Sequence, residues 1–172
     1  MTTIDEALRT LESEKIRLRR DAVGQLKELA DARSLPAFIK ALTSDPDEYV
    51  RIDAAEALGR IGDWRATPAL LMALKSDELL TLLQADWESL SSITDKDEHN
   101  KRWFFLADTM AAQISDIRRA AAIALGQLGD ADAVGGLIDA LHDKADANVR
   151  DAAAQALRMI GTLAALAALT RD

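Results

Sequence analysis

The chain has 172 residues, of which 49% are hydrophobic but only 4% aromatic, and it carries a net charge of −8 and no cysteine. Its length suffices for one domain with a substantial core. The lack of cysteine excludes disulfides, thiolate metal sites and a cysteine nucleophile. The negative charge disfavours binding to the phosphate backbone of nucleic acids, which requires clustered Lys and Arg. A local basic cluster at Arg17, Arg19 and Arg20 is expected to be a solvated face.

The N-terminal segment predicts neither a secreted nor a membrane protein. MTTIDEALRT lacks the basic start and apolar run of a signal peptide. No stretch of the sequence is apolar enough to span a bilayer. We therefore expect a cytoplasmic location.

The first predicted element is a short amphipathic helix at the N-terminus. Ile4, Leu8 and Leu11 fall on one helical face. The opposite face is charged, with Asp5, Glu6, Arg9 and Glu12. A polar outer face suits the end of a stack of helices, so we expect this helix to cap the repeats.

The rest of the chain repeats itself with a period of 32 to 35 residues, which is typical of stacked helical hairpins. Each repeat has an apolar anchor residue, and the anchors are Leu18, Val50, Leu82, Ile117 and Val149. A leucine stands eight residues after every anchor, at Leu26, Leu58, Leu90, Leu125 and Leu157. Such spacing predicts the buried face of a first helix in each repeat.

Turn residues then separate the first helix of a repeat from the second. Gly62 supplies the left-handed geometry that ends a helix, and Asp63 suits the cap of the next one. Pro68, like Pro36 one repeat earlier, fits the first turn of the second helix. Alanine fills intermediate positions of the first helices and lets neighbouring helices approach closely; these residues are Ala54, Ala55, Ala57, Ala121, Ala122, Ala124, Ala152, Ala153 and Ala156.

The segments VRIDAAEALGRIGDWRATPALLMAL (50–74) and IRRAAAIALGQLGDADAVGGLIDAL (117–141) resemble HEAT-like repeats of the phycobilin-lyase type. The resemblance covers about residues 16–170 and implies an all-α fold, an α-solenoid of about five HEAT-like hairpins behind the capping helix. We expect one domain over residues 1–172. Its repeats are predicted at about 16–47, 48–79, 80–114, 115–146 and 147–172.

The resemblance says more about fold than about function, since such repeats occur in lyases, hydroxylases and adaptors. We expect a non-catalytic scaffold that binds another protein through a groove lined by the second helices. A phycobilin-lyase-like or chaperone-like component acting on a tetrapyrrole-binding protein is an alternative implied by the resemblance alone. A nucleic-acid-binding repeat protein is a second alternative, which the net charge opposes.

The residues argue against catalysis and against a bound metal or cofactor. Deoxyhypusine hydroxylases, which the repeats also resemble, hold iron with His-Glu pairs early in their first helices. Here that place is taken by Ile52-Asp53 and its counterparts, and the two histidines, His99 and His142, lie in different repeats. The loop at 95–100 lacks the glycine and the terminal acid of a calcium loop. We expect no cofactor and no metal.

Three side chains break the repeat where exposure is expected, and they are the candidate partner-binding residues: Trp64, Met72 and Trp103. Trp64 stands in a turn where other repeats have alanine, and it can equally well fold back over the end of the hairpin or contact a partner. Trp103 lies in the irregular third repeat, which gathers aromatic and acidic residues, and it can equally well be a packing residue.

Two further expectations concern charge and self-association. The arginines that follow four of the anchors, Arg19, Arg51, Arg118 and Arg150, could contact the aspartates thirteen residues after the anchors in a ladder between repeats. The last helix, 162–170, carries no charge. We expect it to pack back through Leu163, Leu166 and Leu169 and to form a homodimer through the C-terminal edge. The alternative is that the alanines of this edge are simply exposed to water, with no partner.

Overall fold

The computed structural model describes residues 3–75 and 96–170, except the side chains of 96–100 and 102–108. Its α-helices, in chain order, are α1 (Ile4–Thr10), α2 (Ile16–Leu29), α3 (Leu35–Ser44), α4 (Glu48–Ile61), α5 (Thr67–Lys75), α7 (Lys96–Leu128), α8 (Val134–Leu141), α9 (Ala147–Ile160) and α10 (Leu163–Ala168). Three 3-10 turns precede second helices, namely η1 (Ala32–Ser34), η2 (Trp64–Ala66) and η3 (Ala131–Ala133). Over these ranges there is no strand, and no helix is long and apolar enough to cross a membrane.

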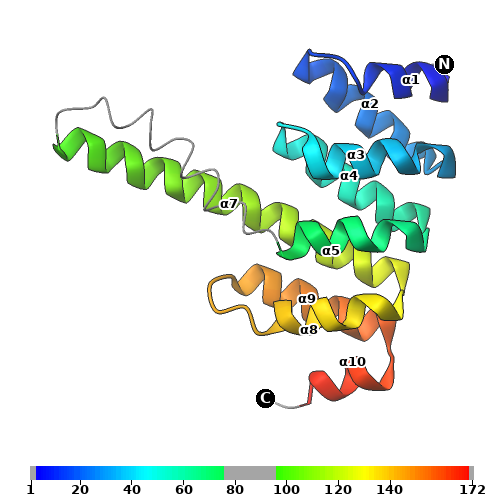
Figure 1. Ribbon diagram of the computed structural model, residues 1–172, viewed down its shortest axis with the longest axis vertical. Coiled ribbons are helices and arrows are strands. Elements are labelled where there is room, and N and C mark those ends of the chain that lie inside the picture. The colour runs from blue at the N-terminus through cyan, green and yellow to red at the C-terminus, as the bar shows by residue number, and fades with distance from the viewer. Residues whose placement is uncertain (1–2, 76–95, 171–172) are drawn as a thin grey trace.

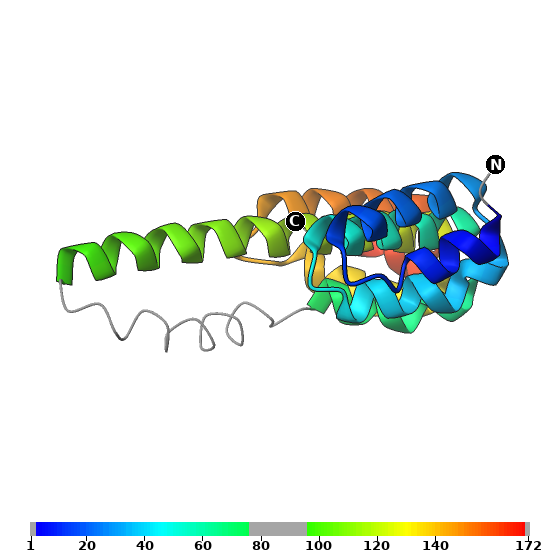
Figure 2. The same cartoon turned by 90° about the horizontal axis from the view of Figure 1, so that it is seen from above.

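The helices form a two-layered solenoid (Figures 1 and 2). One layer holds the first helices, with α2 against α4, α4 against α7 and α7 against α9. The other holds the second helices, with α3 against α5, α5 against α8 and α8 against α10. The short helix α1 packs on α2 at the N-terminal end, as expected of a capping helix.

The core lies where the repeat pattern predicts it. The leucines eight residues after the described anchors are fully buried, namely Leu26, Leu58, Leu125 and Leu157. The nine alanines predicted to pack between first helices are all buried too. The anchor Leu18 is an exception, and it is 42% exposed; Leu29, near the end of the same helix α2, is 53% exposed.

The turns between first and second helices also follow the sequence pattern. Gly62, Gly129 and Gly161 end α4, α7 and α9 in the left-handed conformation, with φ between 66° and 70°. Asp63 then caps η2, since its carboxylate accepts a hydrogen bond from the backbone N–H of Arg65 at 3.0 Å. The first repeat uses Ala30 instead of glycine, at φ 45°.

First helices approach one another at two glycines, nine residues after their anchors. A Cβ added to Gly59 would lie 2.9 Å from the Cα of Ala124, and one added to Gly126 would lie 2.7 Å from the Cα of Ala156. Ala124 and Ala156 occupy the same repeat position. The α4–α7 and α7–α9 junctions therefore have the same geometry.

The matching geometry of these two junctions changes where the predicted third repeat can lie. The sequence places a repeat at 80–114 between the second and fourth, but α4 contacts α7 directly. The expected repeat boundary between residues 114 and 115 falls inside α7, which continues from Lys96 to Leu128 and projects beyond the stack (Figures 1 and 2). The first helix expected for that repeat lies outside the described residues.

A missing helix cap explains why α7 does not begin at the fourth repeat. In α4 and α9 an aspartate three residues before the anchor, Asp47 or Asp146, accepts a hydrogen bond from a backbone N–H of the first turn. The equivalent residue before Ile117 is Ile114, which is buried. Nothing in the segment Ala-Ala-Gln-Ile around it breaks a helix, so the helix extends upstream.

Among the described residues the predicted arginine–aspartate ladder is wrong, although Arg118 pairs with a different aspartate, Asp143. Arg51 Nε donates to the carbonyl oxygen of Leu42 at 3.0 Å, and Arg118 Nε donates to that of Leu74 at 2.9 Å. Each arginine thus binds the C-terminal end of the preceding second helix. The expected aspartates lie at the other end of the first helix, about 18 Å away at 1.5 Å per residue.

The glycine contacts predict opposite effects for two Gly→Ala substitutions. Gly126→Ala should lower the free energy of unfolding by about 1–3 kcal/mol, because the new methyl group forces α7 and α9 apart. Gly24→Ala in α2 should raise it by about 0.4–1 kcal/mol, since open space surrounds Gly24 and alanine restricts the unfolded chain. Urea denaturation measures both, and equal effects would contradict the assigned helix contact.

Ser34 predicts a stabilising substitution. Its hydroxyl is buried and has no hydrogen-bond partner among the described residues, and the third position of η2 and η3 holds the buried alanines Ala66 and Ala133. Ser34→Ala should raise the free energy of unfolding by about 1 kcal/mol, because an unsatisfied buried hydroxyl is removed. Thermal denaturation checks this, and a lowered melting temperature would mean that the hydroxyl is hydrogen-bonded in solution.

Candidate protein-binding surface

Trp64 is the first predicted site residue, and its side chain is 70% exposed. It is the first residue of the turn η2. Ala66 of this turn is fully buried, and Asp63 caps its start. The Arg65 guanidinium and the Arg65 backbone N–H both donate to Asp63, and they lower the pKa of that carboxyl to about 2. Asp63 therefore stays charged at neutral pH, and the turn that presents Trp64 stays capped.

Met72 lies on the outer face of α5 and is 68% exposed. Lys40 of α3 and Asp139 of α8 occupy the same repeat position and are exposed as well. Beneath this row α5 and α8 lie close together, since a Cβ added to Gly136 would be 2.5 Å from a methyl carbon of Leu71. Met72 is thus an exposed apolar side chain on a firmly packed pair of second helices.

The third candidate, Trp103, cannot be joined to this surface. Its backbone belongs to the projecting half of α7, and its side chain is outside the described residues. The backbone of residues 96–100, expected in a loop, belongs to α7, whereas Trp87 lies outside the described residues. The structure therefore brings Trp64 and Met72 onto one hairpin and leaves Trp103 as a prediction.

A cavity that the sequence did not reveal lies between α1 and α3 and has a volume of about 620 Å³. Its lining comes from α1 and the residues after it, Arg19 of α2, Arg33 of η1, α3 and the turn after α3, so no single repeat position marks it. Of the nearby basic cluster, Arg17 and Arg20 are exposed as the sequence predicts, but Arg19 is not. Arg19 is buried, and its guanidinium donates to Asp45 at 2.8 and 3.0 Å.

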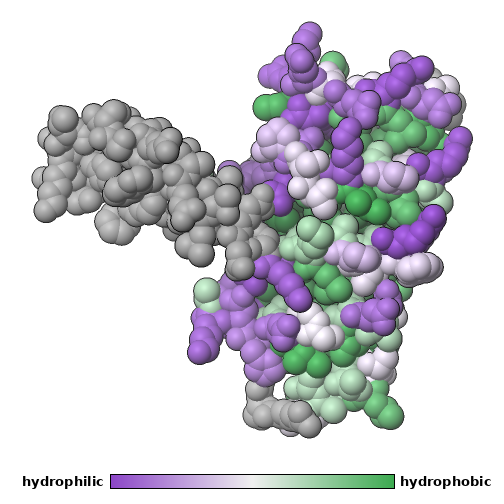
Figure 3. Space-filling view, in the orientation of Figure 1, coloured by the Kyte–Doolittle hydropathy of each residue, from purple (hydrophilic) through white to green (hydrophobic). Residues whose placement is uncertain are grey.

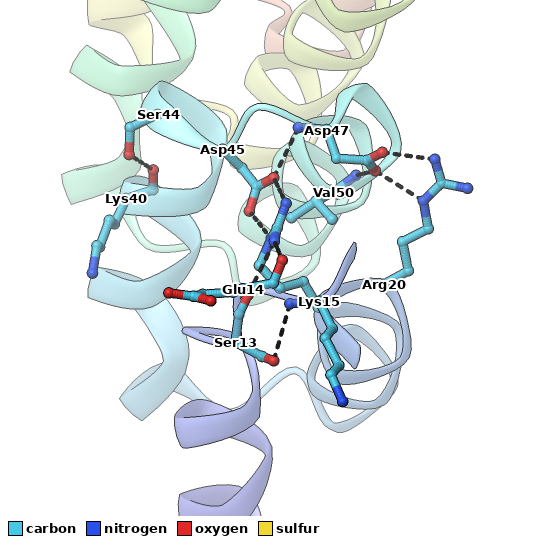
Figure 4. A network of polar contacts seen from close by, with 10 residues as sticks. Ser13, Glu14, Lys15, Arg20, Lys40, Ser44, Asp45, Asp47 and Val50 are labelled. Atoms are coloured by element: carbon cyan, nitrogen blue, oxygen red, sulfur yellow. Dashed lines mark hydrogen bonds and ion pairs between the residues drawn. The ribbon is translucent and has the colours of Figure 1, made fainter. Parts of the chain in front are cut away.

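Arg20 is held in a similar way by the next carboxylate of that turn (Figure 4). It donates to Asp47 at 2.9 and 2.7 Å and lies over the ring of Tyr49. The hydrogen bonds from Arg20 lower the pKa of Asp47 below its ordinary value, although partial burial opposes them. Arg19 and Arg20 therefore fix the turn between α3 and α4 and do not form a free cationic patch.

The C-terminal helix packs in a different orientation from the one predicted. Ala165 is fully buried and Ala168 nearly so, whereas Leu163 and Leu166 are 88% and 45% exposed. Only Leu169 of the three leucines packs against the core. Alanine fits the narrow space beside α8 and α9, and two leucines face outward at the end of the stack, where the surface is mostly apolar (Figure 3).

Within residues 3–75, 101 and 109–170, no three His, Cys, Asp or Glu side chains gather as metal ligands. Asp53, at the place where the hydroxylases have a His-Glu pair, is bound by Lys27, which also contacts Glu56 at 3.0 Å. The carboxylates of this region are engaged in contacts between α2 and α4.

One solved structure in the comparisons has a similar fold. The complex of CpcE and CpcF of phycocyanin lyase from Nostoc sp. PCC7120 matches with a TM-score of 0.65 and 21% identity, over all of this chain and 66% of that chain, just under two thirds of its length. Human deoxyhypusine hydroxylase in complex with glycerol aligns with a TM-score of 0.40 and 23% identity, over 96% of this chain and 76% of that chain. The comparison with curated proteins gives no match. A family model for HEAT repeats matches residues 4–91 and 105–171, and the chain therefore belongs to the HEAT-repeat family.

Proposed function

We propose that the protein is a non-catalytic scaffold that binds another protein through the layer of second helices. The observation that carries the proposal is the exposure of Trp64 and Met72 on one hairpin of that layer. Other repeats place Ala32 and Ala131 at the position of Trp64. Because the same turn accepts alanine in other repeats, packing does not require an exposed tryptophan there. Tryptophan is enriched among the residues that dominate the binding energy of protein interfaces.

The form of the surface supports a protein as the ligand. In the view that shows the second helices, apolar patches alternate with charged side chains along the length of the stack (Figure 3). Mixed polar and apolar composition is typical of non-obligate protein interfaces. The net charge of −8 opposes a nucleic-acid ligand.

A lyase-like or chaperone-like role remains the alternative. It is supported by the fold shared with the CpcE–CpcF complex, which contains two subunits and so also fits a protein partner. The two roles differ in the ligand. Absorbance of a bilin mixed with this protein and an apoprotein acceptor would change under the alternative and stay unchanged under the scaffold proposal.

The proposed surface predicts a loss of binding without a loss of stability. Trp64→Ala and Met72→Ala should each weaken capture of the partner from the native host roughly tenfold or more, because central apolar anchors contribute about 2 kcal/mol or more to binding. The melting temperature should remain nearly unchanged, since both side chains lie largely in water. Affinity capture with quantitative mass spectrometry and thermal denaturation measure the two effects.

Leu29→Ala is the matched control, because Leu29 is also an exposed apolar residue but belongs to the layer of first helices. It should leave capture unchanged. If Leu29→Ala weakens capture as much as Trp64→Ala does, the binding surface is elsewhere. A large fall in melting temperature for Trp64→Ala would make the tryptophan a packing residue.

We further propose that a second copy of the chain pairs through α10. Leu163 and Leu166 form an exposed apolar face there. Arg158 stands in α9 at the position of the contact glycines Gly59 and Gly126, so another repeat cannot stack in the usual geometry. Two-fold pairing of α10 with its copy buries the leucines without bringing Arg158 into a close helix contact.

Sedimentation equilibrium tests this pairing. The natural chain should sediment as a dimer, and Leu163→Glu/Leu166→Glu should sediment as a monomer of unchanged thermal stability, because the charges would have to be buried in the interface. Leu29→Glu, which adds charge at an exposed leucine of α2, should remain a dimer. A monomeric natural chain rejects the pairing.

A further inference from the structure

The cavity between α1 and α3, here called the α1–α3 pocket, has an apolar floor and a cationic rim. Leu11 and Ala41 are buried at its floor, with Leu8 and Ala37 partly buried beside them. The volume of about 620 Å³ falls within the roughly 300–1,000 Å³ of typical ligand sites. A second cavity within the described residues, between α4 and α7, is much smaller, at about 170 Å³.

The pocket exists because α1 is short. α1 has 7 residues and packs on α2, whereas α3 has 10 residues. Farther along the stack each second helix lies against the next, as α3 does against α5 and α5 against α8. At the N-terminal end, the outward side of α3 is left uncovered beside α1.

Exposed basic side chains surround the opening. Arg9 has no ion pair among the described residues. Lys40 contacts Glu12 at 3.0 Å, with both side chains about 70% exposed, and Arg33 contacts Asp31 at 3.0 Å. Exposed pairs of this kind contribute only about 0–1 kcal/mol, so an incoming carboxylate can replace one partner at little cost.

The pocket has a small excess of positive charge, although the whole chain is negative. The lining contains four basic residues, Arg9, Arg19, Arg33 and Lys40, and two acidic ones, Glu12 and Asp45. Arg19 and Asp45 neutralise one another in the wall. Asp31 beside Arg33 and Glu12 beside Lys40 balance two more cations, which leaves Arg9 as the excess positive charge. At physiological salt, charges are screened beyond about 8 Å, so a short ligand meets these rim residues rather than the acidic residues elsewhere on the chain.

We propose that the α1–α3 pocket receives an acidic segment of the partner protein, with an aliphatic side chain on the floor and carboxylates at Arg9 and Lys40. The proposal rests on the proposed function, since it places a second contact on the layer of second helices. A nucleic acid would leave the apolar floor unused, and its long polyanion would meet the net charge of −8. A short acidic peptide uses both the floor and the rim.

A fluorescein-labelled short peptide of alternating Glu and Leu tests the proposal by fluorescence polarisation. It should bind the natural chain, and added salt should weaken the binding. Arg9→Glu/Lys40→Glu should weaken it roughly tenfold or more, because attraction becomes repulsion. Arg17→Glu/Lys144→Glu, an equal charge change at exposed residues outside the pocket, should leave the affinity within about twofold.

Two further experiments test whether the peptide binds in the α1–α3 pocket. Ala37→Trp places a large side chain in the pocket without changing charge and should weaken binding, with circular dichroism showing that the variant is folded. A Glu–Ser peptide should bind at least tenfold more weakly than the Glu–Leu peptide, since it has nothing for the floor. Equal binding by the Glu–Ser peptide, or by the Arg9→Glu/Lys40→Glu variant, overturns the proposal.

The outcome is separable from that of the proposed function. If the Glu–Leu peptide fails to bind the natural chain while Trp64→Ala still weakens partner capture, the pocket proposal is wrong and the scaffold proposal stands. If the peptide binds as described but Trp64→Ala and Met72→Ala leave capture unchanged, the pocket holds an acidic segment and the surface at Trp64 is wrong.

Discussion

The close approach of neighbouring first helices at Gly59 and Gly126 is the contact on which the rest of the stack depends. At 2.7 to 2.9 Å from the facing Cα atoms, not even a methyl group fits without a shift of the helices. The facing positions must then be small as well, which explains the buried alanines of α4, α7 and α9 and the aromatic content of only 4%. Larger apolar side chains, the leucines eight residues after the anchors, fill the space between the two layers instead.

The same contact fixes the order of the repeats. Since α4 meets α7 as α7 meets α9, the unit beginning near Ile114 follows the unit of α4 and α5 directly. The chain joins this unit through α7, which begins at Lys96, beyond the stack. The HEAT-repeat match is interrupted between residues 91 and 105, around the start of α7. An interruption inside a solenoid is tolerated when the junction on either side keeps its normal geometry.

Much of the fold could be predicted from the sequence, because burial follows the repeat position and the turns follow glycine, aspartate and proline. The stacking order could not be read from periodicity, since Leu82 and Leu90 keep the spacing of the other repeats. The sequence signal for the long helix α7 was Ile114, which stands where α4 and α9 have a capping aspartate. In α10 the pattern failed for a different reason: leucine and alanine are both apolar, and the available space, not hydropathy, decided that Ala165 faces inward. The α1–α3 pocket depends on helix lengths and on side chains from separate elements, which no local pattern records.

The continuous helix α7 has a mechanical consequence. Its 33 residues span about 50 Å, and between Lys96 and Leu128 the sequence has no proline and only one glycine, Gly126, near the end. Without a hinge, the part of α7 that projects from the stack and the part that packs against α4 and α9 rotate as one rod. A force applied near Lys96 therefore reaches the contacts with α4 and α9 as a torque, amplified by the length of the lever.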